Sequence, residues 1–314
     1  MTVGRDMLHL MGLDPPPGPH LVSAAVGGVL FVVLVLGVIL GWRWFDAHSA
    51  ALAAGAERLR KRLIATKAAK HLAARYPRIW KFFSARFARG EYLGLHLTVG
   101  FVISFVGLWL FVAITEDVIE GDPITKFDVR VLSWMNAHAT PVGYKIFQAI
   151  SFLATPEVMT VIIVIVGVAL AKRREWFMLA GWTFSILGGG ALDWILKALI
   201  RRPRPSNAER FLTHVSWSFP SGHSMSAFVG YAMLAYALIV LTVHRRTARM
   251  ALVFGTVVVI LAVGLSRIYL GVHYFSDVVG AYAVGLLWVS TCISGLEVVR
   301  RWRARGTPPA VGNG

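Results

Sequence analysis

Residues 21–40 read LVSAAVGGVLFVVLVLGVIL, twenty residues without a charged side chain. A helix of about 20 apolar residues is long enough to cross the ~30 Å hydrocarbon layer of a bilayer. Six further apolar runs lie at 93–114, 154–171, 176–199, 224–243, 250–266 and 278–296. The runs at 154–171 and 250–266 are short and need flanking residues to cross the membrane. The sequence therefore predicts an all-α, polytopic membrane helix bundle with seven spans.

The composition supports a membrane protein and argues against most soluble enzymes. Of 314 residues, 56% are hydrophobic and 15% are charged, with a mean hydropathy of +0.64, whereas soluble domains carry about 25% charged residues. The net charge of +16 is typical of proteins that bind nucleic acid or an anionic membrane surface. With this much apolar sequence the membrane is the expected partner, and no nucleic acid is expected. Cys292 is the only cysteine, which excludes a disulfide framework and a multi-cysteine metal site.

The distribution of Lys and Arg predicts the orientation, because cytoplasmic loops collect positive charge. Segment 42–90 holds 12 of these residues, loops 172–175 and 244–249 hold three each, and the tail after 296 holds four. In a model with seven spans these four segments lie on one side of the membrane. We therefore expect the N-terminus outside and the C-terminus in the cytoplasm.

Four parts of the chain follow from this pattern. They are an N-terminal tail with an extra span (1–45), a basic amphipathic segment (46–90), a six-helix core (91–298) and a basic cytoplasmic tail (299–314). Residues 21–40 could instead be the apolar region of a cleaved signal peptide, but they are long for one and the preceding segment is barely basic. Segment 46–90 fits helices lying on the anionic leaflet, and a partner-binding or regulatory role is the alternative.

Three blocks of polar residues stand at predicted helix ends on the outer side. The first is KALIRRPRP, which runs from Lys197 to Pro205 and contains Arg204. The second is PSGH, residues 220–223. The third is SRIYLGVHYFSD, residues 266–277. Basic residues on the side that normally avoids them indicate an anionic ligand.

Together the blocks resemble the three-part signature of the type 2 phosphatidic acid phosphatase superfamily, which includes lipid phosphatases, glucose-6-phosphatase and vanadium-dependent haloperoxidases. The resemblance covers about residues 93–297 and leaves out the first span and the basic segment. It implies a six-helix membrane phosphatase core with a phosphate site at the outer ends of the helices.

The chemistry of the residues in these blocks also supports a phosphate site. Lys197, Arg204 and Arg267 supply cations for a phosphate, with the Arg forks suited to bidentate contact. Ser221 and Gly222 begin a predicted helix, where backbone N–H groups face an anion.

The remaining residues supply the predicted reaction. His273 and Asp277, four residues apart on a predicted helix, share a face, so the carboxylate orients the imidazole as a nucleophile. His223 is then the general acid, and later the base that activates water.

Several neighbours have less specific interpretations. Asp193, four residues before Lys197, is expected to pair with that lysine. Arg201 and Arg202 either assist substrate head groups or are solvated loop charges. The glycines 188–190 lack the rest of a nucleotide loop and lie in an apolar run, so they predict close helix packing.

The sequence thus predicts a metal-independent, cofactor-free hydrolase of lipid phosphates or diphosphates, in the cytoplasmic membrane of a bacterium. Polyprenyl diphosphate is preferred as substrate, because an outward-facing site fits carrier-lipid recycling. Phosphatidic acid, phosphatidylglycerol phosphate and a phosphotransferase reaction remain alternatives. A soluble haloperoxidase does not fit seven spans, and a transporter does not explain three motif blocks at one face. The oligomeric state is not predicted.

Overall fold

The computed structural model describes residues 92–305, apart from 122, 207 and 209–215, together with single residues between 54 and 77. The predicted span at 21–40 and nearly all of the amphipathic segment 46–90 lie outside the described residues. The division of the chain at 45, 90 and 298 therefore stays a prediction.

The described part of the chain is helical and without strands. Its helices are α5 (Tyr92–Glu120), α6 (Pro123–Ala137), α7 (Pro141–Phe152), α8 (Pro156–Lys172), α9 (Trp176–Ile200), α10 (Gly222–Leu241), α11 (Arg246–Tyr269) and α12 (Phe275–Arg305).

Six segments of the described chain are long and apolar enough to cross a membrane, which confirms the predicted membrane helix bundle. The short run at 154–171 gains the flanking residues it needs, since α7 and α8 together form one candidate span, Pro141–Lys172. Pro141 and Pro156 each stand at the first position of a helix, where the backbone N–H that proline lacks would have no partner within the helix. The chain is a multi-pass membrane protein.

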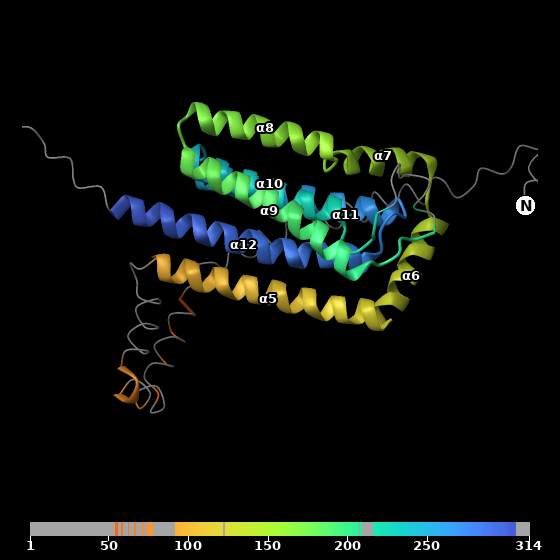
Figure 1. Cartoon of the computed structure of the whole chain (residues 1–314), viewed down its shortest axis with the longest axis horizontal. Coiled ribbons are helices and arrows are strands. Elements are labelled where there is room, and N and C mark those ends of the chain that lie inside the picture. The colour runs from red at the N-terminus through yellow and green to blue at the C-terminus, as the bar shows by residue number, and fades with distance from the viewer. Residues whose placement is uncertain are drawn as a thin grey trace, which may run out of the picture.

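Helix α12 is the centre of the bundle and packs against α5, α6, α9, α10 and α11. Figure 1 shows α5 on one side of it and α9 and α10 on the other. The main core forms where α9, α10 and α12 meet, and includes Trp182, Met225 and Val284. Gly107 lets α5 approach closely, because a Cβ there would lie 2.8 Å from the carbonyl oxygen of Ala283 in α12.

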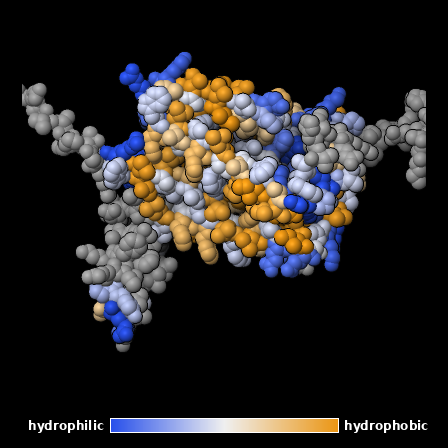
Figure 2. All heavy atoms as spheres, in the orientation of Figure 1, coloured by the Kyte–Doolittle hydropathy of each residue, from blue (hydrophilic) through white to orange (hydrophobic). Residues whose placement is uncertain are grey.

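Apolar side chains also cover the outside of the bundle. Phe101, Trp194 and Leu199 are each more than 70% exposed, and Figure 2 shows hydrophobic residues spread over the visible side of the bundle. Large apolar side chains facing outward all along a helix are stable against lipid tails and unstable in water.

One end of the bundle gathers the motif blocks. The last residues of α9 and α11 and the first residues of α10 and α12 lie there, and α6 crosses that end (Figure 1). The sequence analysis did not anticipate α6, because its 15 residues mix apolar and charged side chains and give no span signal. These helix ends bring residues as far apart in the sequence as Lys197 and Asp277, 80 positions, to the same end of the bundle.

Candidate active site

A buried histidine–aspartate pair lies at the start of α12. The side chains of His273 and Asp277 are 1% and 0% exposed, with Nδ1 3.3 Å from Oδ2. His273 precedes α12, which begins at Phe275, so the prediction that both residues lie on one helix was wrong for the histidine. Asp277 nevertheless reaches back, because it also accepts a hydrogen bond from the backbone N–H of Tyr274 (2.9 Å) and caps the turn.

The hydrogen bonds of His273 define its tautomer. Nη1 of Arg204 lies 3.1 Å from Nε2 of His273, and a guanidinium has donors only. Nε2 must therefore accept, and the ring proton belongs on Nδ1, facing Asp277. Burial lowers the pKa of His273 below its usual range, and Asp277 opposes this shift only in part. The imidazole is thus neutral, with the Nε2 lone pair directed at a cation that binds anions.

Arg204 is fixed by the backbone around it. Its Nε donates to the carbonyl oxygen of Ser216 (2.6 Å), its Nη2 donates to the hydroxyl of Ser216 (2.8 Å), and its Nη1 donates to the carbonyl oxygen of Val272 (3.0 Å). These contacts tie the loop after α9 to the turn before α12. They hold the guanidinium next to Nε2 of His273.

The other two predicted cations lie near by, inside helices. Nζ of Lys197 binds Oδ1 of Asp193 at 2.5 Å, which confirms the expected pairing of these two residues. Arg267 is 6% exposed and donates through Nη1 to the hydroxyl of Ser151. Its Nε is buried without a hydrogen-bond partner among the described residues. A buried donor of this kind costs free energy unless a ligand accepts from it.

We call Lys197, Arg204 and Arg267 the cation clamp. All three lie within electrostatic range of His223, as does His273. His223 is the second residue of α10 and makes no hydrogen bond to the described part of the chain. The helix therefore presents a half-buried imidazole to a space surrounded by positive charge.

The N-terminus of α10 is shaped for close approach. Ser221 is the N-cap residue, and its own N–H donates to the carbonyl oxygen of Asp277 (3.0 Å). The prediction that this N–H faces an anion was therefore wrong for Ser221, although Gly222 begins α10 as predicted. No side chain caps the first turn of α10, which leaves its N–H groups for another acceptor. A Cβ on Gly222 would lie 3.2 Å from Nζ of Lys197, so a larger residue would crowd the clamp.

The structure adds residues that the sequence analysis did not assign to the site. Arg202, whose side chain is 10% exposed, binds Asp277 (2.6 Å) and Asp128 of α6 (2.7 Å). Both predictions for Arg202 were wrong, because it neither faces solvent nor is free for a head group. Burial lowers the pKa of Arg202, but the ion pairs with Asp277 and Asp128 outweigh this effect and raise it. The guanidinium also lies over the ring of Tyr274, 4.3 Å from its centre.

Two serines complete this support. Ser218 donates to Oδ2 of Asp277 at 2.5 Å, and Ser276 donates to Asp128 through both its N–H and its hydroxyl. Arg201 by contrast is exposed, and its Nε binds the carbonyl oxygen of Ala198, as expected for a loop charge. Nothing local in the sequence marks Asp128, because its partners lie 74 and 148 residues away.

The site can bind a tetrahedral anion between protein cations and helix N–H groups, next to a neutral imidazole. No group of three His, Cys, Asp or Glu side chains that could bind a metal ion occurs among the residues described. Fold and site together define a multi-pass membrane protein with a buried, positively charged cluster at one end of its helix bundle.

Comparison with known proteins agrees with this class. Residues 178–300 match the PAP2 superfamily model. Phosphatidylglycerophosphatase B of Bacillus subtilis is 31% identical over 208 residues, which are 64% of this chain and 98% of that protein. The crystal structure of a transmembrane PAP2 type phosphatidylglycerolphosphate phosphatase from B. subtilis is similar with a TM-score of 0.58 and 27% identity, over 63% of this chain and 100% of the other.

Two further relatives carry different names. Human dolichyldiphosphatase 1 is 28% identical over 53% of this chain and 74% of its own length. Decaprenylphosphoryl-5-phosphoribose phosphatase of Mycobacterium tuberculosis is 32% identical over 50% of this chain and 72% of its own. The chain belongs to the PAP2 superfamily, and it is a hydrolase of lipid phosphoesters. The resemblance inferred from the three blocks is confirmed.

Proposed function

We propose that this protein hydrolyses a lipid phosphate or diphosphate without a metal, through a phosphohistidine at His273. One observation carries the proposal: Nε2 of His273 faces Arg204 while Nδ1 faces Asp277. A nucleophilic nitrogen is thereby oriented by a carboxylate and lies beside a cation that binds phosphate.

In the first step the Nε2 lone pair of His273 attacks phosphorus, and the bond from phosphorus to the lipid oxygen breaks. The clamp and the N–H groups of α10 balance the charge on the phosphoryl oxygens. In the apo state Nη1 of Arg204 is 3.1 Å from Nε2, so a phosphate oxygen has to take over that hydrogen bond before attack. Protonated His223 gives its proton to the departing oxygen.

In the second step neutral His223 takes a proton from water, and the hydroxide attacks the phosphohistidine. The P–N bond breaks, inorganic phosphate leaves and His273 regains its lone pair. The clamp supplies positive charge that metal ions supply in other phosphatases. The proposed catalytic residues are thus His273, His223 and Asp277, and the proposed phosphate-binding residues are Lys197, Arg204, Ser221, Gly222 and Arg267.

For the substrate we propose a polyprenyl diphosphate, acted on at the outer face of a bacterial cytoplasmic membrane. The names of the dolichyl and decaprenyl relatives support a polyprenyl tail, and the Lys/Arg distribution supports the outward orientation. The name of the B. subtilis relative supports phosphatidylglycerol phosphate as the second candidate.

The test is phosphate release by the purified protein in detergent. The panel contains a polyprenyl diphosphate and monophosphate, phosphatidic acid and phosphatidylglycerol phosphate, and each reaction is also quenched within milliseconds to trap acid-labile phosphoenzyme. We expect free phosphate, fastest from the polyprenyl diphosphate, and a phosphohistidine at His273. Transfer of the phosphoryl group to another lipid without phosphate release would identify a phosphotransferase, and a phosphoenzyme at another residue would refute the mechanism.

A further inference from the structure

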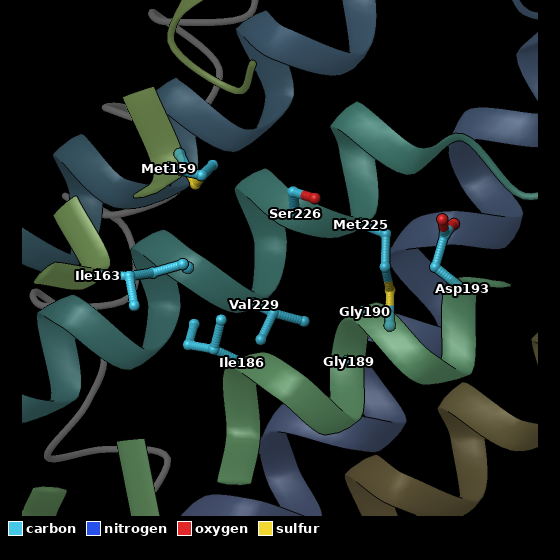
Figure 3. A pocket seen from close by; sticks show the side chains of 10 residues that line it. Met159, Ile163, Ile186, Gly189, Gly190, Asp193, Met225, Ser226 and Val229 are labelled. Carbon is cyan, nitrogen blue, oxygen red and sulfur yellow. The ribbon is translucent and has the colours of Figure 1, made fainter. Parts of the chain in front are cut away.

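A pocket lies between α8, α9 and α10, next to the clamp (Figure 3). Its volume is about 150 Å³, and apolar side chains such as Ile163, Ile186 and Val229 form most of its wall. Its polar lining residues are Asp193 and Ser226. A cavity of about 150 Å³ accommodates an apolar molecule of the size of benzene, which corresponds to roughly six carbon atoms.

We propose that this pocket binds the first carbon atoms of the lipid tail, on the group that leaves phosphorus. The inference rests on the proposed function and extends it from the phosphate to the leaving group. It assigns a hydrocarbon-binding role to residues outside the three motif blocks.

The pocket begins where the phosphate site ends. Asp193 lines the pocket and binds Lys197 of the clamp at 2.5 Å. A Cβ on Gly222, at the start of α10, would lie 3.3 Å from Oδ2 of the same aspartate. A molecule bound at the N-terminus of α10 is therefore separated from the pocket by little more than one side chain.

The pocket lies on the same face of α10 as His223, the proposed general acid. Ser226 and Gly230 line the pocket and follow His223 by three and seven residues, so the three residues share one face of the helix. His223 protonates the oxygen that carries the lipid. The tail is carried by that oxygen directly in a monophosphate and through a second phosphate in a diphosphate, so it leaves the site on the side of His223, and the same face of α10 leads it into the pocket.

The glycine run of α9 provides independent support. A Cβ on Gly188 would lie 2.3 Å from the ring of Trp288, and a Cβ on Gly189 would lie 3.2 Å from Val229. Close helix packing therefore explains these two glycines, as the sequence predicted. It does not explain Gly190, where a Cβ would have no heavy atom within 4 Å. Gly190 lines the pocket and is exposed, so a larger side chain has room beside the pocket there.

The surroundings favour hydrocarbon as the occupant. The three helices that form the pocket belong to candidate membrane spans, and Trp194 and Leu187, on the same helix as Gly190, are exposed on the outside of the bundle. A polar ligand would lose its hydration there without finding partners for its hydrogen bonds. A methylene chain has no hydrogen bonds to lose in an apolar pocket and gains contacts with its wall.

The experiment varies tail length and pocket size together. We would measure kcat/KM for methyl, propyl, hexyl and dodecyl phosphate in one detergent, with the wild-type protein, Gly190→Leu and Gly190→Ala. The control is Gly255→Leu in α11, where a Cβ also has no heavy atom within 4 Å. Partition of each substrate into micelles is the same for all proteins and cancels in the comparison.

We expect the wild-type ratio of hexyl to methyl kcat/KM to fall at least about tenfold in Gly190→Leu and less in Gly190→Ala, since each buried methylene contributes about fourfold. Gly255→Leu should keep the wild-type ratio. An unchanged ratio in Gly190→Leu, or an equal loss for all tail lengths, would overturn the tail pocket. Neither result touches the proposed function, which fails separately if the wild-type protein releases no phosphate and forms no phosphohistidine.

Discussion

Replacing Arg202 should destabilise the protein more than replacing any other loop arginine. Its guanidinium is the shared partner of two aspartates that are both 0% exposed, Asp277 at 2.6 Å and Asp128 at 2.7 Å. The same Nη1 also donates to the hydroxyl of Ser276 at 2.7 Å. Arg202→Met keeps much of the apolar volume and removes the positive charge and its hydrogen bonds.

The size of the effect follows from burial. Removal of one partner of a buried ion pair costs about 3–5 kcal/mol, because the other charge stays in the interior. Arg202→Met leaves two such carboxylates, so we expect the upper part of this range. Asp128→Asn should cost less, about 1.5–3 kcal/mol. Arg202 then keeps Asp277, and the amide oxygen can still accept from the N–H of Ser276.

Arg202→Lys should recover only part of the loss, because a single ammonium group cannot bind two carboxylates in fork geometry. The neighbouring variant Arg201→Met is the matched control. Arg201 is exposed and its Nε binds the carbonyl oxygen of Ala198, so its replacement should change stability by less than about 0.5 kcal/mol.

The assay is denaturant-induced unfolding of the purified variants in one detergent at one pH. Turnover is measured on the same samples. Because Arg202 holds Asp277, which orients His273, kcat should fall by about two orders of magnitude while KM changes little. Equal destabilisation by Arg202→Met and Arg201→Met, or a larger effect of Asp128→Asn than of Arg202→Met, would refute the reasoning.

Three further predictions concern the chemistry and the topology. Activity should survive excess EDTA and be inhibited by vanadate, because the cation clamp balances the charge of the phosphoryl group; loss in EDTA that Mg²⁺ restores would contradict this. His273→Ala should abolish turnover of every substrate, whereas His223→Ala should slow monophosphates more than diphosphates, by up to about 10²–10⁴-fold, since an alkoxide needs the proton more than a phosphate does; equal penalties would exclude the proposed division of roles. For the topology, single cysteines are placed in a Cys292→Ala background at two exposed positions, Ser206→Cys at the site end of the bundle and Arg173→Cys at the opposite end. In intact cells an impermeant thiol reagent should label Ser206→Cys and not Arg173→Cys. The reverse labelling would put the site in the cytoplasm.

The sequence by itself determined the membrane class and the long apolar helices of the core. Apolar length is a local property, so the runs at 176–199 and 278–296 sufficed to predict α9 and most of α12. The pairing of Asp193 with Lys197 was predictable for the same reason, because residues four apart on a helix share a face.

Only the tertiary structure decided which residues support His273 and Asp277 and where open space lies beside them. Asp128 and Arg202 are 74 residues apart, and a carboxylate on a short amphipathic helix looks solvated until its partner is known. Gly190 looks like its two neighbours in the sequence, yet they contact other helices and it faces open space. Burial and open space depend on which helices meet, and that depends on contacts across the whole bundle that no local pattern encodes.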